Sequence, residues 1–343
     1  MNTTSSLDTS SFTFGADGFF YDPFGEPCVL VGVVEFSKLC QHLDSMFESP
    51  LGRKLIYAAT DAEERVLSNH PTVQFGRWFG RSKAQRRLKE RASQMGWGGF
   101  DAEHVTSPAH DALTVGFSLA HHEHLSQCRA NVEWSQASAE VIHLTYSPKN
   151  ETMTPAPVPQ HLTWFGLQHG GSSEERLEIE LDRRVNAFFH GEERSFFLPV
   201  NVFKHLLTSL LGRPLSPEFS PAFHLEIDQS LEHGEAFRTM IHASCLAFEA
   251  SHRPVYVQSS SDWKGHLTDR LTKRGFGRTV VEKSILDGDG SSVFSVQSSV
   301  APVTIGLLIG MWQRAHGTIG DAKIEVAANS ILVHLSLRGV DYL

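Results

Sequence analysis

The stretch that decides the fold is "CVLVGVVEFSKLCQHL" at residues 28–43, because its layout recurs as "SFFLPVNVFKHLLTSL" at residues 195–210. Each begins with a short apolar run, typical of a buried strand, and continues as an amphipathic helix. The apolar helix positions coincide at one constant offset and follow the i, i+3, i+7 stripe. They are Phe36, Leu39 and Leu43 in the first stretch and Phe203, Leu206 and Leu210 in the second. The chain is therefore expected to contain a duplicated strand–helix unit.

Three further correspondences follow in the same order. A basic helix ends in Gly-aromatic-Gly around Trp97 and Phe276, which is typical of a helix C-terminus. The next segments align at Gly116 and Gly306, and each half closes on an alternating strand, with His143 set against His334. The paired segments are residues 87–100 and 270–281, 112–125 and 302–315, and 139–146 and 330–337. Internal repeats of this kind indicate two copies of one domain.

The predicted fold class is α/β (α+β), with two tandem copies of a domain in which an antiparallel sheet packs against several helices. We expect a disordered tail over residues 1–20, the first repeat over 21–150, a Pro/Thr-rich linker over 151–180 and the second repeat over 181–343. The second repeat carries an insertion near residues 211–235, in which three prolines interrupt regular structure.

Composition restricts the class of protein. The 343 residues are 41% hydrophobic, and no apolar run reaches the ~18 residues that a membrane span requires. The four cysteines are scattered without a CxxC pair, so a soluble, cytoplasmic protein with reduced thiols is expected. A formal charge of −9 argues against a general nucleic-acid coat.

One stretch is locally basic. Residues 77–94 are rich in Lys and Arg and include Trp78 and Phe79, so phosphate contact through Arg81–Arg91 is an alternative to a solvated helix face. We favour the solvated face, because charge runs on helices usually have that role.

Histidines crowd the stretch "HHEHLSQC" at residues 121–128. On a helix His121 and His124 share a face with Cys128, and with His110 or His104 as a further ligand they form a candidate Zn²⁺ site. The second copy offers a control, since it has Met, Trp, Gln and Arg at the positions of residues 121–124. We therefore favour a polar helix end, where histidine interacts favourably with the helix dipole.

The order of these elements resembles the 4-vinyl reductase domain. The resemblance is carried best by "KERASQMGWGGF" (89–100) followed by "VTSPAHDAL" (105–113), together with the small-residue helices "LIYAATDAEERVL" (55–67) and "MIHASCLAFEASH" (240–252). It implies a homodimer-prone α/β domain with an apolar pocket for a small hydrophobic or aromatic molecule. The cysteine-rich metal pattern of many such domains is missing from both halves, which puts a family metal site in doubt.

The expected ligand site lies between each small-residue helix and the helix that contains Gly116 or Gly306, where small side chains leave room. The candidate ligand-binding residues are Ala58, Ala59, Trp97, Gly116, Phe117, His143, Ala243, Phe276, Gly306 and His334.

The resulting hypothesis is a sensory or scaffolding protein that binds an apolar ligand and signals through a protein partner. P-loop, dinucleotide, serine-hydrolase and zincin motifs are missing from the sequence, which favours a non-enzymatic role. Two alternatives stay open: a metal-binding enzyme or accessory factor in tetrapyrrole or other small-molecule metabolism, and an assembly adaptor without a ligand. A homo-oligomer is compatible with each of them.

Overall fold

Two antiparallel strands, β4 (Pro27–Gly32) and β11 (Glu193–Pro199), form the centre of the computed structural model. Leu30 pairs directly with Phe197, and these two residues are also equivalent in the sequence repeat. The two halves are therefore related by an approximate two-fold axis that passes through this pair. The structure describes residues 5–6, 12–15, 18–74, 80–165, 181–184, 186–284 and 290–337.

The elements of the two halves follow one another in matching order. The first half contains β4, α1 (Val33–Ser45), α2 (Lys54–Asn69), α3 (Gly80–Gln94), β5 (Gly99–Phe100), β6 (His104–Thr106), α4 (Asp111–Ser126), β7 (Ala130–Ser138) and β8 (Val141–Pro148). The second half contains β11, α5 (Val200–Leu210), β12 (Leu225–Ile227), α6 (Gly234–Ala250), α7 (Asp262–Arg270), η3 (Thr272–Arg274), β13 (Arg278–Ser284), β14 (Ser292–Gln297), α8 (Ala301–His316), β15 (Gly320–Val326) and β16 (Ile331–Leu337).

Three sheets organise these elements. The central sheet has the order β1-β9-β10-β11-β4-β3-β2, and its outer strands are β1 (Ser5–Ser6), β2 (Thr13–Phe14), β3 (Phe20–Tyr21), β9 (Asp182–Arg184) and β10 (Ala187–His190). The first half adds a sheet of order β5-β6-β8-β7, and the second half one of order β12-β15-β16-β14-β13. The predicted fold class, two copies of an antiparallel sheet with helices, is thus confirmed.

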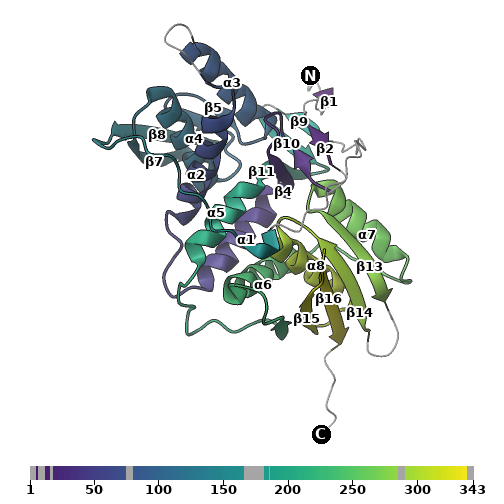
Figure 1. The fold of residues 1–343 in the computed structure, drawn as a ribbon. Coiled ribbons are helices and arrows are strands. Elements are labelled where there is room, and N and C mark those ends of the chain that lie inside the picture. Colours follow the sequence, from purple (N-terminus) through teal and green to yellow (C-terminus); the bar gives the residue numbers. More distant parts are fainter. Residues whose placement is uncertain are drawn as a thin grey trace.

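The two halves exchange their first strand and helix. Helix α1 packs against α6 of the second half, and α5 packs against α2 of the first half (Figure 1). The indole N–H of Trp97 donates to the carbonyl of Phe197 at 2.8 Å, and the Arg274 guanidinium donates to the carbonyl of Leu30 at 3.1 Å. Neither of the expected repeat ranges, 21–150 and 181–343, therefore packs as a separate body.

The N-terminal segment belongs to the fold where the structure describes it. Phe12 stacks on Phe197 with ring centroids 4.4 Å apart, and Phe19 and Phe20 are buried. The expectation of a disordered tail over residues 1–20 is therefore wrong for residues 12–15 and 18–20. Apolar side chains drive this order, because burying an aromatic ring stabilises a strand edge.

The described part of the linker also contacts the second half. Trp164, in the short 3-10 helix η2 (Thr163–Phe165), is buried and donates to the carbonyl of Glu232 at 3.0 Å. Leu162 is buried beside it. Residues 166–180 of the expected linker lie outside the described residues.

The helix pairs α2–α4 and α6–α8 are in close contact at the two repeat glycines. A Cβ atom on Gly116 would lie 2.4 Å from the carbonyl oxygen of Ile56, and one on Gly306 would lie 2.4 Å from that of Ile241. Both distances are far below van der Waals contact, so each glycine is required by the neighbouring helix backbone. None of the described helices is long and apolar enough to cross a membrane.

Candidate functional site

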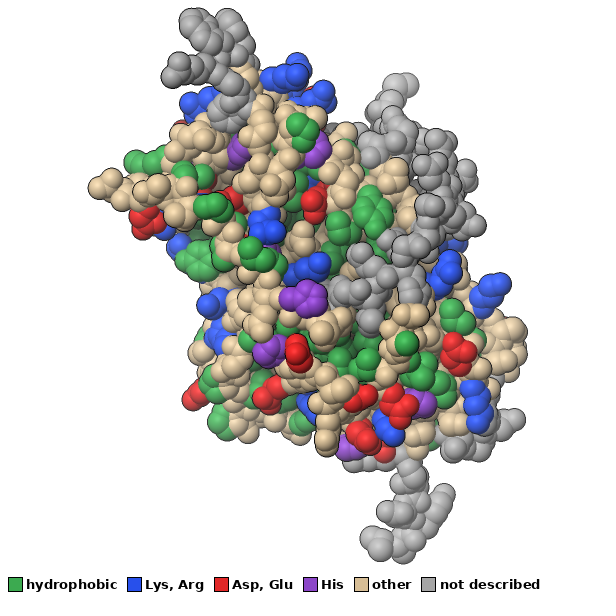
Figure 2. Space-filling model, in the orientation of Figure 1, with side chains coloured by type: hydrophobic (Ala, Val, Ile, Leu, Met, Phe, Trp, Pro, Cys, Tyr) green, Lys and Arg blue, Asp and Glu red, His purple; other side chains and the backbone are tan. Residues whose placement is uncertain are grey.

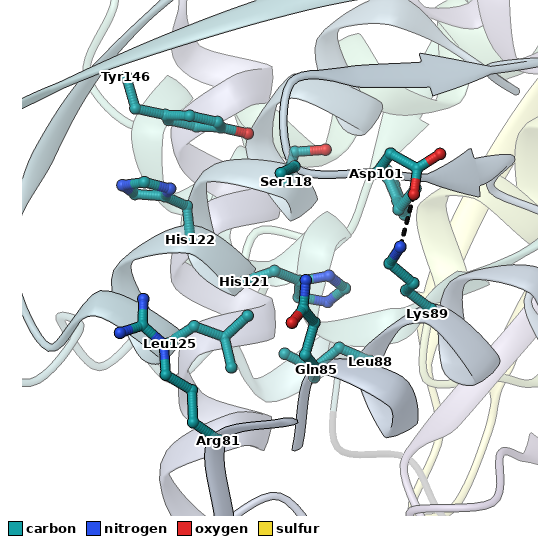
Figure 3. Close-up of a pocket in the computed structure, with 12 residues that line it drawn as sticks. Arg81, Gln85, Leu88, Lys89, Asp101, Ser118, His121, His122, Leu125 and Tyr146 are labelled. Atoms are coloured by element: carbon teal, nitrogen blue, oxygen red, sulfur yellow. Dashed lines mark hydrogen bonds and ion pairs between the residues drawn. The ribbon is translucent and has the colours of Figure 1, made fainter. Parts of the chain in front are cut away.

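The candidate site is a cavity of about 240 Å³ in the first half, open to one side, between α3, α4 and the strands β5 and β8 (Figure 3). It is lined by Arg81, Gln85, Leu88, Lys89, Phe100, Asp101, Ala102, Ser118, His121, His122, Leu125 and Tyr146. Apolar and aromatic surface is thus combined with several polar and cationic groups, as is usual in small-molecule sites.

Helical spacing explains why these side chains meet. On α4 the lining residues are Ser118, His121, His122 and Leu125, which follow the i, i+3, i+4, i+7 pattern of one helix face. On α3 they are Arg81, Gln85, Leu88 and Lys89, which follow i, i+4, i+7, i+8. Taken alone, each of these two helix faces has the composition of an ordinary polar surface. The cavity arises because the two faces are opposed in space.

The open side of the cavity carries charged and aromatic groups. The Lys89 ammonium contacts the Asp101 carboxylate at 2.5 Å, and the His122 ring stacks on Tyr146 with centroids 4.0 Å apart. Burial lowers the pKa of His122, while its neighbours Glu123 and Arg81 act on it in opposite directions. Burial raises the pKa of Tyr146. Both side chains are therefore neutral at pH 7 and present hydrogen-bonding groups without charge.

A buried ion cluster supports the inner wall. The Arg91 guanidinium, 1% exposed, binds the Glu63 carboxylate through Nε at 2.9 Å and also pairs with Asp22. His121 reaches the same Glu63 carboxylate at 3.1 Å. Burial alone would raise the pKa of Glu63, but Arg91 and His121 outweigh it and hold the pKa at about 2. The cavity wall is thus coupled to the N-terminal segment through Arg91.

Within the described residues, the four residues of the predicted metal site do not form a ligand set. His124 bonds the carbonyl of Val73 at 3.0 Å, and the Cys128 thiol contacts its neighbour's carbonyl at 3.4 Å. His110 precedes α4 at its other end, about 16 Å from His121 at 1.5 Å per residue, so it cannot share an ion with it. Among the residues that the structure describes, no group of three or more His, Cys, Asp or Glu side chains is placed to hold a metal.

The helix-end interpretation accounts for only part of the histidine cluster. His124 lies in the last turn of α4, as the helix-end interpretation requires. His121 instead belongs to the buried cluster with Glu63 and Arg91, and His122 belongs to the cavity. Sequence reasoning missed Glu63 and Arg91, because residues 28 and 58 positions apart are brought together only by the packing of α2, α3 and α4.

The residues predicted to bind a ligand pack within the core instead. Trp97 stacks on Phe117 with ring centroids 3.8 Å apart, and Ala59 lies against Gly116. The space directly beside Gly116 and Gly306 is occupied by the neighbouring helix, and the cavity that Ser244, Ala247 and Phe276 help to line between α1, α6 and α8 measures only about 10 Å³. The other core positions are Ala58, Ala243 and Phe276, all buried.

The two strand histidines are not equivalent in space. Across β7–β8, Ser135 pairs with His143, whereas the corresponding residue of β15, Glu325, pairs with Leu332. His143 is exposed, and His334 bonds the Glu325 carboxylate at 3.1 Å. The predicted apolar surroundings are therefore not observed for His143.

The basic stretch is partly neutralised by ion pairs. Figure 2 shows Lys and Arg side chains gathered at the end of the molecule where Figure 1 places α3. Arg87 pairs with Glu90 at 3.0 Å, and Arg91 is buried, so Arg91 is not available to a nucleic acid. Trp78 and Phe79 lie outside the described residues.

The corresponding region of the second half is filled. The position of His122 is taken by Trp312, which is fully buried, stacks on His316 at 4.2 Å and donates to the Ser292 hydroxyl at 3.2 Å. Met311, also buried, takes the position of His121. The polar cavity is therefore a property of the first copy, while the second copy has a packed apolar core at that place.

Comparison of the chain with protein-family models, with curated proteins and with solved structures finds no match in any of the three. The resemblance to the 4-vinyl reductase domain accordingly stays a prediction.

Proposed function

We propose that this chain binds a small molecule with an apolar, planar body and an acidic group in the cavity of its first half. The observation that carries the proposal is the contrast between the two copies: one has an open cavity lined by His121 and His122, and the other fills that place with Met311 and Trp312. Random loss of packing is an unsatisfactory explanation, because the inner wall contains the buried imidazole of His121, which is hydrogen-bonded to the buried Glu63 carboxylate.

The lining supports this class of ligand. Leu88, Phe100 and Leu125 provide apolar surface for a planar body, and the stacked ring of Tyr146 adds an aromatic wall. The guanidinium of Arg81 supplies positive charge, which favours a carboxylate or sulfonate. The ligand class agrees with the aromatic ligand expected from sequence, although the site is a different one.

A sensory role would use the shared carboxylate of the inner wall. A ligand that bonds His121 competes with Glu63 for the imidazole, and Glu63 also holds Arg91. Since Arg91 pairs with Asp22, occupancy of the cavity would alter the anchoring of the N-terminal segment.

The test uses 1-anilinonaphthalene-8-sulfonate, an aromatic anion, as a fluorescent probe with the full chain. Arg81→Gln should weaken binding roughly fivefold, the equivalent of about 1 kcal/mol for a partly exposed charge contact. Lys83→Gln is the matched control, since Lys83 is exposed on the same helix outside the cavity and its loss changes the net charge equally.

A second variant tests the location. His122→Trp introduces the residue of the second copy and should fill the cavity and abolish probe binding while leaving the unfolding midpoint near that of the parent. Equal probe binding by the parent, Arg81→Gln and His122→Trp would refute the proposed site. Native mass spectrometry of the purified chain would show whether it retains an organic molecule of this class.

A further inference from the structure

The second half protects a sheet edge that the first half leaves at the surface. Strand β12, from the insertion near residues 211–235, adds to β15 in parallel, with Leu225 opposite Ala322 and Ile227 opposite Ile324. Backbone bonds at 3.0 Å join the Ala322 N–H to His224 and the Asp228 N–H to Ile324. In the part of the chain that the structure describes, the equivalent sheet of the first half ends at β7.

Side chains that β12 and the insertion cover in the second half have more exposed counterparts in the first half. The offset that aligns Gly116 with Gly306 also sets β7 on β15, so that Glu133 corresponds to Lys323 and Trp134 to Ile324. Ile324 is 1% exposed beside β12, whereas Trp134 is 38% exposed. His242 on α6 is fully buried, with the Phe223 ring of the insertion 4.3 Å from its own, whereas its counterpart Tyr57 on α2 is 50% exposed. Two large aromatic side chains of the first half thus lie uncovered where the second half is covered.

An arginine marks the same place in both halves. Arg238 on α6 donates to the carbonyl of Leu225 and so anchors the added strand. Its counterpart, Arg53, lies over the Trp134 ring with its guanidinium carbon 5.0 Å from the ring centroid. Three features hold β12 in the second half: an apolar surface, a strand edge and a cationic donor. The first half has an equivalent of each.

We propose that β7 is a docking edge for an extended segment of a partner protein, which adds as a strand parallel to β7 over Val132–Trp134. Strand addition satisfies the backbone groups of an edge strand and places alternate side chains on the same face. The proposal does not depend on the cavity or its ligand.

The geometry of β12 specifies the chemistry of the segment. Phe223, Leu225 and Ile227 show that an aromatic and two apolar residues at alternate positions fit this surface, and in the first half they would contact Tyr57 and Trp134. The intervening residue, Glu226, stands opposite Lys323.

The charge at the intervening position is reversed in the first half, because Glu133 is the counterpart of Lys323. Opposite charges across a strand pair are stabilising and like charges are destabilising. The partner segment should therefore read aromatic-x-apolar-basic-apolar. The same charge disfavours a second copy of this chain, because symmetric pairing of two β7 strands around Val132–Trp134 would bring two Glu133 carboxylates together.

The experiment compares two labelled peptides by fluorescence anisotropy with the full chain. One copies residues 220–228, "SPAFHLEID", and the other carries Lys in place of Glu226. We expect the Lys peptide to bind roughly tenfold more tightly, as two cross-strand charge differences imply. Glu133→Lys should reverse the preference, whereas Glu151→Lys, an exposed control with the same charge change, should not.

A third variant tests the anchor. Arg53→Gln should weaken both peptides, because the donor to the strand carbonyl is lost. Equal binding of the two peptides to parent and Glu133→Lys, or binding of neither, would overturn the proposal. A concentration-dependent dimer that Glu133→Gln strengthens would likewise overturn it, because the neutral side chain removes the repulsion between two Glu133 carboxylates and the occupant would then be a second copy of the chain.

Discussion

The space around each glycine predicts that substitution by alanine has opposite effects at Gly116 and Gly265. Gly116→Ala places a Cβ atom 2.4 Å from the Ile56 carbonyl oxygen and 2.7 Å from the Ala59 Cβ. Gly265→Ala, on the exposed face of α7, places one where no atom lies within 4 Å. We expect Gly116→Ala to destabilise the protein and Gly265→Ala to stabilise it.

The magnitudes follow from two opposing effects. Alanine in a helix interior is about 0.5–1 kcal/mol more favourable than glycine, and this gain applies at both positions. Overpacking costs about 1–3 kcal/mol, and the cost at Gly116 falls at the upper end because the obstructing atom belongs to the backbone of α2. The net loss for Gly116→Ala is therefore about 2 kcal/mol, against a gain of about 0.5–1 kcal/mol for Gly265→Ala.

Urea unfolding of both variants measures these values, with the midpoint interpreted only where the slope is unchanged. Gly306→Ala should behave like Gly116→Ala, because its Cβ would lie 2.4 Å from the Ile241 carbonyl oxygen. Adding Ala59→Gly to Gly116→Ala should restore little, since it removes the side-chain contact but leaves the Ile56 oxygen in place. A Gly116→Ala protein as stable as Gly265→Ala would refute the close contact between α2 and α4.

Three further predictions concern buried polar groups. Glu63→Gln should cost about 3 kcal/mol at pH 6, because Arg91 loses the carboxylate that accepts two of its guanidinium hydrogen bonds. The pKa of Glu63 is held at about 2, below its ordinary 4.5, so urea unfolding should show this loss shrinking as the pH falls from 4.5 toward 2. Trp97→Phe should cost about 1–3 kcal/mol by leaving the Phe197 carbonyl without its donor, measured by the same unfolding. Burial lowers the pKa of His242 from 6.5 to about 4, so the protein should lose stability between pH 6.5 and pH 4, and His242→Leu should remove about 2 kcal/mol of the difference between pH 7 and pH 5.

Local patterns in the sequence were sufficient to predict the main helices of each half and their repetition. The stripe that begins at Phe36 and recurs at Phe203 lies on buried faces of α1 and α5, and Gly116 and Gly306 occupy matching contacts. A sequence repeat, however, does not indicate whether an element packs against its own copy or against the other copy. The exchange of α1 and α5 between the halves depends on the pairing of β4 with β11, which no periodicity specifies.

The candidate site was less predictable for a physical reason. Small residues such as Ala59 favour both a cavity and close helix packing, and only the separation of the helix axes decides between them. Likewise, histidine spacing at His121 and His124 is compatible with a metal, a helix end or an ion cluster. The deciding partner of His121, Glu63, lies on another helix and carries no local signal.

The exchange of first strands and helices affects how the chain responds to being cut. Each half contributes an arm, residues 27–45 or 193–210, that packs against the other half. The two halves are therefore interlocked, as in a domain-swapped dimer. A protease that cleaves the exposed segment near Val158 would sever the covalent connection without releasing either fragment. Separation would require both arms to detach, which makes the nicked protein long-lived, and its lifetime would be set by a rate of unfolding rather than by an affinity.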